Sequence, residues 1–128
     1  MPISTLSYDG RCDVKLIVDV HGTELPLTAL VDSGFTSGTG FGLKLPNAFA
    51  SHANYTGTGC VQVADGRQIA TETIPDAKIV QIEGHRLNEK VTVPAIFMDG
   101  SHGAIGVLFL QVCNLELNGP IRTATIRF

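Results

Sequence analysis

Residues 14–34 read VKLIVDVHGTELPLTALVDSG, and this stretch carries the strongest fold signal of the chain. Apolar and polar side chains alternate on both sides of His21-Gly22, first from Val14 to Val20 and then from Leu25 to Val31. Such alternation is typical of half-buried β-strands, and a Gly-containing break between two such runs is typical of a hairpin. The pattern therefore predicts a β-hairpin whose second strand ends directly before Asp32.

The tripeptide Asp32-Ser33-Gly34 continues from that strand, after Leu30-Val31 and before Phe35-Thr36. A carboxylate held in a Gly-containing turn at the end of a buried strand lies at the floor of a cavity, where its surroundings can tune its acidity. Acid/base hydrolases hold a catalytic aspartate in this way. The alternative is an ordinary Asx-type turn, which is what an isolated Asp-Ser-Gly indicates.

A second hairpin is expected around Asp65-Gly66, because this dipeptide favours the positive backbone angles of tight hairpin turns. Residues 60–64 and 67–70 flank it as β-rich segments. The spacing of turn signals predicts further β-rich segments at residues 74–82, around Gly84-His85, at 90–98, at 115–117 and at 123–128. The predicted architecture is mostly β, in a single domain that spans residues 1–128.

Short helices are expected at only two places. Pro46 suits a first helical position and indicates a short helix within residues 43–50. Residues 107–113 place apolar side chains at helical spacing after Ile105-Gly106.

Composition limits the class of protein. A chain of 128 residues has room for one domain and one core, and its 44% apolar and 16% charged residues favour self-association. The net charge is −3, and the nine basic residues are scattered, which argues against a nucleic-acid partner. No apolar run approaches the roughly 20 residues that span a membrane, and the amino terminus does not resemble a signal peptide. We therefore expect a cytoplasmic protein without membrane attachment.

The cysteines and histidines do not form a pattern typical of metal ligands. Three separated cysteines match neither a disulfide framework nor a metal site, so they are predicted to be small buried hydrophobic residues: Cys12, Cys60 and Cys113. Four single histidines lie beside glycines or small polar residues and are predicted to be turn residues: His21, His52, His85 and His102. Neither a metal nor another cofactor is expected.

Four segments, in this order, resemble the retropepsin-like (clan AA) aspartic proteases, most closely the small single-domain prokaryotic members with an Asp-Thr/Ser-Gly-Phe motif. They are residues 29–36 (ALVDSGFT), 43–46 (LKLP), 63–66 (VADG) and 105–106 (IG). The order of the four segments carries the specificity. Ser33 stands in place of the commoner Thr, Ile105 in place of the usual Leu, and Asn118 where an Asp is often found. The resemblance implies closed, barrel-like β-sheets with one or two short helices, in a dimer.

This chain contains a single Asp-Ser-Gly, so a site with two carboxylates would need a second copy of the chain. Hydrolysis by carboxylates needs one ionised group to activate water and one protonated group to polarise the carbonyl, and two adjacent aspartates share one proton. We therefore hypothesise that two chains each contribute Asp32 to one site. By resemblance, Ser33 hydrogen-bonds across the interface, Gly34 permits close approach of the two turns, and Thr36 supports the carboxylate.

The resemblance also implies a substrate cleft. The hairpin at Ala64, Asp65 and Gly66 would be a flap that closes over an extended peptide. Phe35 and Ile105 are candidates for the cleft wall, with packing as the alternative, which is favoured for Ile105. Residues 125–128 resemble terminal segments that pair between subunits, and an ordinary edge strand is the alternative.

Two functions remain open from the sequence. The first is a homodimeric aspartic endopeptidase that acts on peptide or protein substrates through the paired Asp32 carboxylates. The second is a catalytically inactive dimeric peptide-binding module with the same fold, because a fold does not guarantee a function. Three other sites lack the residues that they require. No Gly-Lys-Ser/Thr follows residues 34–42, as a phosphate-binding loop needs, and no Gly-x-Ser-x-Gly or neighbouring base accompanies Ser33 or Ser37, as a serine hydrolase needs. No cationic residue adjoins Cys60 to make its thiol reactive.

Overall fold

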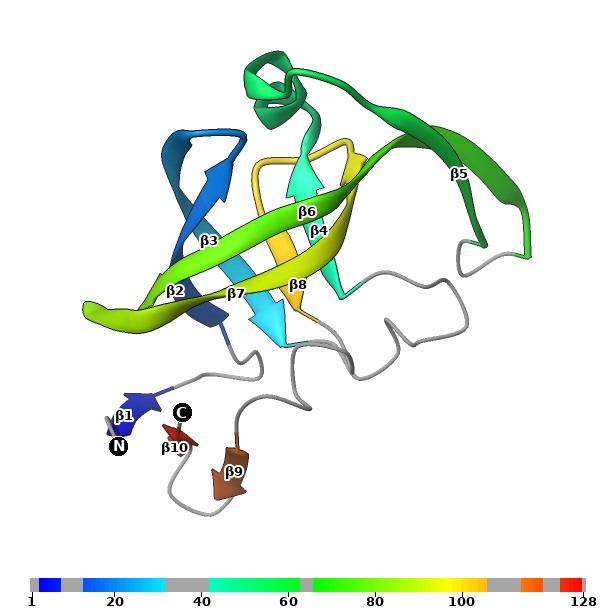
Figure 1. Ribbon diagram of the computed structural model, residues 1–128. Coiled ribbons are helices and arrows are strands. Elements are labelled where there is room, and N and C mark those ends of the chain that lie inside the picture. Colours follow the sequence, from blue (N-terminus) through cyan, green and yellow to red (C-terminus); the bar gives the residue numbers. More distant parts are fainter. Residues whose placement is uncertain are drawn as a thin grey trace.

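The computed structural model describes residues 3–7, 13–31, 42–62, 66–105, 114–118 and 123–127 (Figure 1). Most of these residues lie in strands, as the sequence predicts, and one short 3-10 helix, η2 (Asn47–His52), accompanies them. The strands, in chain order, are β1 (Ile3–Ser7), β2 (Asp13–Val20), β3 (Thr23–Val31), β4 (Leu43–Pro46), β5 (Gly57–Gln62), β6 (Gln68–Ile82), β7 (His85–Met98), β8 (Gly103–Ile105), β9 (Asn114–Asn118) and β10 (Thr123–Arg127).

Six of these strands form a closed barrel. They follow the order β2-β3-β8-β4-β7-β6, and β6 pairs back with β2 to complete the circle. β5 lies outside this circle and pairs with β6. Because closure pairs both edges of every barrel strand, β5 is the outer strand of this sheet within the described part of the chain.

The first predicted hairpin is confirmed. β2 and β3 pair antiparallel from Asp13 opposite Leu30 to Val20 opposite Thr23. The turn between them consists of His21, with φ 48°, and Gly22, with φ 101°. Two successive positive φ angles are what a two-residue type I′ hairpin turn requires, and the twist of this turn matches that of the strands.

A parallel pairing positions the end of β3. Val31, the residue before the Asp-Ser-Gly motif, pairs with Ile105 of β8. On its other edge β8 is antiparallel to β4, with Ile105 opposite Leu43. The two strands that flank residues 32–41 therefore both lie beside Ile105, at one end of the barrel (Figure 1).

The core fills the barrel interior with branched aliphatic side chains, three alanines and one large aromatic ring. Phe97 of β7 is the largest of the fully buried side chains in the described residues. The core cluster consists of Val14, Leu16, Val18, Val20, Leu27, Ala29, Leu43, Leu45, Ile74, Ala77, Ile79, Ile82, Val93, Ala95, Phe97 and Ile105. Alternate residues of β2 supply four of these side chains, which is the reason that the sequence alternation predicted this strand correctly.

Gly103 allows β8 to fit between its neighbours. A Cβ atom at this position would lie 2.5 Å from the backbone oxygen of Lys44 and 2.8 Å from Cδ2 of Leu27. Gly103→Ala is therefore expected to destabilise the fold by about 1–3 kcal/mol, because the backbone of β4 must shift. Urea unfolding measures this change, with Ser101→Ala as the exposed control two residues earlier. Equal stability of the two variants would contradict this packing.

The second predicted hairpin is also present. β5 and β6 pair antiparallel from Gly57 opposite Thr73 to Gln62 opposite Gln68. Gly66 has a φ of 88°, as a tight turn requires, and residues 63–65 lie outside the described residues. Figure 1 shows this hairpin projecting from the barrel.

Several local predictions need correction. Residues 43–46 form strand β4, because they pair with β7 and β8, so Pro46 precedes the 3-10 helix instead of beginning it. Gly84 lies in the turn between β6 and β7, with a φ of 80°, and His85 begins β7. The sequence did not predict β1 or the three-residue β8. The helix predicted at residues 107–113 falls outside the described residues.

A small second sheet contains both ends of the described chain. Its order is β1-β10-β9, with Ile3 opposite Arg127 and Thr123 opposite Asn118. Both carboxyl-terminal strands were predicted from the sequence, whereas the pairing of β10 with β1 was not. No helix among the described residues has the length and apolar character needed to cross a membrane.

Candidate functional site

Most of the predicted site residues lie outside the described part of the chain: Asp32, Ser33, Gly34, Phe35, Thr36, Ala64 and Asp65. Gly66 and Ile105 are described. Gly66 is exposed at the turn of the projecting hairpin, and a Cβ atom at this position would have no other atom within 4 Å. Ile105 is fully buried and belongs to the core cluster, in agreement with the packing interpretation.

The structure brings together a second group of polar residues that the sequence did not reveal. His21, in the β2–β3 turn, has only 6% of its side chain exposed. Its Nε2 atom lies 2.9 Å from Oδ1 of Asp76 on β6, and its Nδ1 atom accepts a 2.8 Å hydrogen bond from the backbone N–H of Asn54. The Tyr55 hydroxyl donates to Oδ2 of Asp76, and the Tyr55 ring stacks on the His21 ring with centroids 4.4 Å apart. We call His21, Tyr55 and Asp76 the His21 cluster.

The hydrogen bonds determine the tautomer of His21. A nitrogen that accepts from a backbone N–H cannot carry a proton of its own, so Nδ1 is unprotonated and Nε2–H donates to Asp76. Both ring nitrogens are therefore engaged. His21 holds its neighbours in place and has no nitrogen available to act as a general base in this arrangement.

The same contacts lower the pKa of Asp76 and raise the pKa of Tyr55. The hydrogen bond from Tyr55 is the largest cause that lowers the pKa of Asp76, and the bond from His21 adds to it, while partial burial opposes them. The pKa of Tyr55 is raised, chiefly because its hydroxyl hydrogen bond to Asp76 is lost on ionisation. The cluster therefore favours an ionised Asp76 and a neutral Tyr55.

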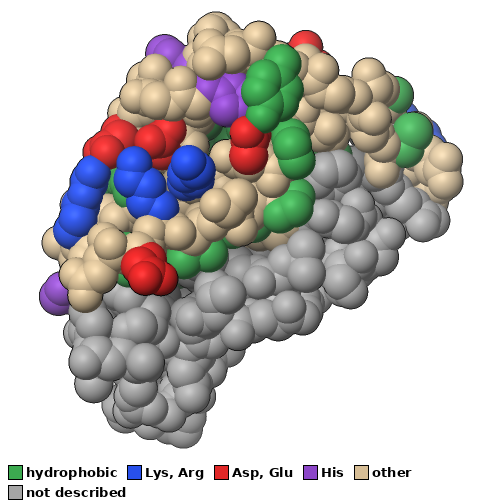
Figure 2. All heavy atoms as spheres, in the orientation of Figure 1, with side chains coloured by type: hydrophobic (Ala, Val, Ile, Leu, Met, Phe, Trp, Pro, Cys, Tyr) green, Lys and Arg blue, Asp and Glu red, His purple; other side chains and the backbone are tan. Residues whose placement is uncertain are grey.

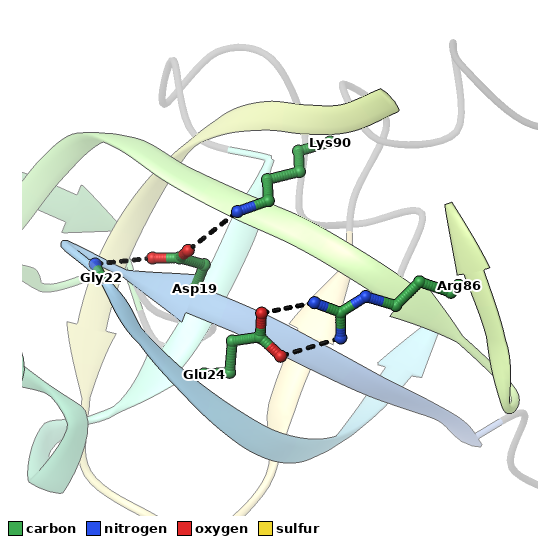
Figure 3. A network of polar contacts seen from close by, with 5 residues as sticks. All are labelled: Asp19, Gly22, Glu24, Arg86 and Lys90. Atoms are coloured by element: carbon green, nitrogen blue, oxygen red, sulfur yellow. Dashed lines mark hydrogen bonds and ion pairs between the residues drawn. The ribbon is translucent and has the colours of Figure 1, made fainter. Parts of the chain in front are cut away.

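Charged residues next to the His21 cluster pair with one another (Figure 3). Asp19 Oδ1 accepts a 2.7 Å hydrogen bond from the Gly22 N–H, and its Oδ2 lies 3.3 Å from Lys90 Nζ. Arg86 donates two hydrogen bonds to Glu24, of 2.8 and 2.5 Å, which lower the pKa of Glu24. Figure 2 shows that acidic and basic side chains are intermingled on this face.

A pocket of about 270 Å³ lies beside the cluster, and its lining consists of Asp19, His21, Gly22, Asn54, Asp76 and Lys78. Within the described ranges, no group of three or more His, Cys, Asp or Glu side chains could hold a metal ion. The prediction that His21 is a turn residue is confirmed, but its contacts could not be predicted, because Asp76 is 55 residues away in sequence.

One cysteine prediction is wrong. Cys60 is exposed, because it lies on β5, outside the barrel, and not on a core strand. Cys12 and Cys113 fall in the segments that the structure does not describe.

Acidification is expected to remove the contribution of Asp76 to stability. A folded-state pKa below the ordinary value of 3.8 adds stability above that value, which is lost as pH falls through the folded-state pKa. With 37% of the side chain exposed, we expect Asp76→Asn to cost about 1 kcal/mol near neutral pH and less at pH values below the folded-state pKa of Asp76. Urea unfolding over this pH range, with Asp99→Asn as a surface control, measures it. A pH-independent cost would contradict this linkage.

Comparison with known proteins adds no family assignment. The chain matches no protein-family model, and the search of curated proteins finds no relative.

Proposed function

We propose that this chain is a homodimeric aspartic endopeptidase of the retropepsin-like type, in which two Asp32 carboxylates activate a water molecule. The observation that carries the proposal is the connection between motif and barrel. Asp-Ser-Gly follows Val31, which pairs with the fully buried Ile105 in a closed barrel. Because Val31 is paired within the barrel, the residue before the motif is held in place, and a catalytic carboxylate requires such a support.

The β5–β6 hairpin supports the same proposal. It leaves the barrel at Gly57 opposite Thr73 and reaches its turn at Gly66. Residues 68–72 of β6 pair with β5 and are not part of the β6–β7 ladder. In the proposal this hairpin is the flap, whose backbone groups bind an extended peptide and exclude water.

The three-stranded sheet supports the dimer. β1, β10 and β9 form a unit separate from the barrel sheet, and β1 and β9 are its outer strands among the described residues. Outer strands offer unpaired backbone groups, and pairing with a second copy satisfies them. The proposed dimer uses this sheet as its interface.

The proposed reaction requires one ionised and one protonated Asp32. The ionised carboxylate takes a proton from water while the water oxygen bonds to the peptide carbonyl carbon. The protonated carboxyl donates its proton to the carbonyl oxygen. When the C–N bond breaks, the amide nitrogen receives the proton that the first carboxylate took from water, and a hydroxyl of the tetrahedral intermediate returns its proton to the second carboxylate as the C=O bond reforms. The products are a carboxylic acid and an amine, and the pair again holds one proton. Neither step needs a metal or an organic cofactor.

Two measurements test the proposal together. The purified chain is incubated with a mixed library of unstructured peptides, the products are identified by mass spectrometry, and sedimentation gives its oligomeric state. Internal cleavage by a dimer is the expected result. A stable monomer would contradict the shared site, whereas a dimer that binds peptides without cleaving them would favour the inactive binding module.

A further inference from the structure

The His21 cluster connects three segments that are distant in sequence. His21 belongs to the β2–β3 turn, Tyr55 to the connection between η2 and β5, and Asp76 to β6. His21 is hydrogen-bonded to both of the other segments: its Nε2–H donates to Asp76, and its Nδ1 accepts from the backbone N–H of Asn54. The Tyr55 hydroxyl completes the triangle by donating to Asp76.

One of these segments, which contains Tyr55, leads into the base of the β5–β6 hairpin, and another, which contains Asp76, leads out of it. The last pair of the hairpin is Gly57 opposite Thr73. Tyr55 precedes this pair by two residues, and Asp76 follows it by three. Asp76 also lies where the β6–β7 register shifts, between Ile74 and Ala77. An irregularity of this kind bends a strand, so the cluster contacts β6 where its direction can change.

The third segment supplies a rigid support. His21 follows Val20, which is fully buried, in a hairpin that belongs to the closed barrel. Its ring is almost completely buried, and both its nitrogens are hydrogen-bonded. By contrast, the nearby hydrogen bond from Thr56 Oγ1 to Glu72 Oε1 is exposed and 3.2 Å long, and it joins the residue before β5 to β6, so it does not connect the hairpin to β2 or β3.

We propose that the His21 cluster anchors the β5–β6 hairpin to the barrel, with His21 and Asp76 as positioning residues that set the direction in which the hairpin projects. A two-stranded hairpin is marginally stable alone, so contacts at its base determine how far its turn moves. The consequence for substrate binding rests on the proposed function, in which this hairpin closes over the peptide. The anchoring itself does not depend on catalysis.

Hydrogen exchange tests the anchor without any substrate. His21→Asn keeps a residue that tolerates the positive φ of the turn, and removes the imidazole. Asp76→Ala removes the acceptor that His21 and Tyr55 share. In both variants we expect the amides of residues 57–62 and 68–73 to exchange about 10-fold faster, while those of the β2–β3 hairpin stay unchanged.

Arg86→Gln is the matched control, because it removes the polar contact between β3 and β7 that lies outside the His21 cluster. It should leave the exchange of the hairpin unchanged. Unchanged exchange of the hairpin in both cluster variants would overturn the anchor. An equal increase throughout the barrel would also overturn it, because it would indicate general destabilisation.

A kinetic readout extends the test to substrate binding. In His21→Asn we expect KM for a long peptide to rise about 10-fold with kcat nearly unchanged, because a loosened hairpin weakens binding more than chemistry. A fall in kcat with constant KM would overturn the positioning role. If the wild-type chain cleaves no peptide, the proposed function fails, and the exchange experiment still decides whether the cluster anchors the hairpin.

Discussion

Replacing Asp32 by Asn is expected to lower kcat for peptide hydrolysis by at least about 10³-fold, because an amide can neither accept a proton from water nor share one with the second side chain of the pair. Asn has nearly the same shape as Asp, so the dimer and its peptide affinity should persist. The measurement compares cleavage of one peptide by mass spectrometry with binding of that peptide by fluorescence anisotropy.

The control for this experiment is Asp99→Asn, which changes an exposed carboxylate in the turn that precedes β8. It should retain full activity. The pH profile of the wild type adds a second check, because two coupled carboxylates give a bell-shaped dependence with apparent pKa values that belong to the pair. Activity in Asp32→Asn close to that of the wild type would exclude the carboxylate mechanism.

Phe97→Ala is expected to produce the largest loss of stability, about 3–5 kcal/mol, because it leaves a cavity that the surrounding strands cannot fill. Phe97 is fully buried, and it pairs with Leu45 across the β7–β4 ladder. Its backbone oxygen also accepts a hydrogen bond from Thr71, so β6, β7 and β4 meet at this residue. Chemical unfolding followed by circular dichroism measures the loss.

Two further variants keep this prediction falsifiable if Phe97→Ala does not fold. Phe97→Leu retains much of the apolar volume and should cost about 1–1.5 kcal/mol. Thr92→Ala lies on the same strand with its side chain exposed, and should change stability by less than about 0.5 kcal/mol. Equal losses in Phe97→Leu and Thr92→Ala would show that the centre of the core lies elsewhere.

The local sequence pattern correctly predicted the elements that a few neighbouring residues specify. The alternation from Val14 to Val20 placed one face of β2 in the core, and His21-Gly22 marked the turn that joins β2 to β3. The Gly66 turn likewise follows from the preference of Asp-Gly for positive φ angles. These predictions succeeded because period and turn chemistry act over a few residues. The catalytic assignment of Asp32 stays a prediction, since its segment is outside the described residues.

The sequence did not predict the features that depend on residues far away in the chain. Three residues of β8 are too few for a recognisable period, and they form a strand because β3 and β4 pair with both edges. The exposure of Cys60 follows from the position of β5 outside the barrel, which composition does not reveal. The His21 cluster joins segments up to 55 residues apart, and no single segment contains its signal.

The sequence by itself thus determined the mostly β class, both hairpins and the strand that leads to Asp-Ser-Gly, because alternation and turn preferences are local properties of the chain. Only the tertiary structure decided the closure of the barrel by β2 and β6, the place of Ile105 beside Val31 and Leu43, and the hydrogen bonds of His21. These depend on which distant strands become neighbours, and that choice is made by the packing of the whole core.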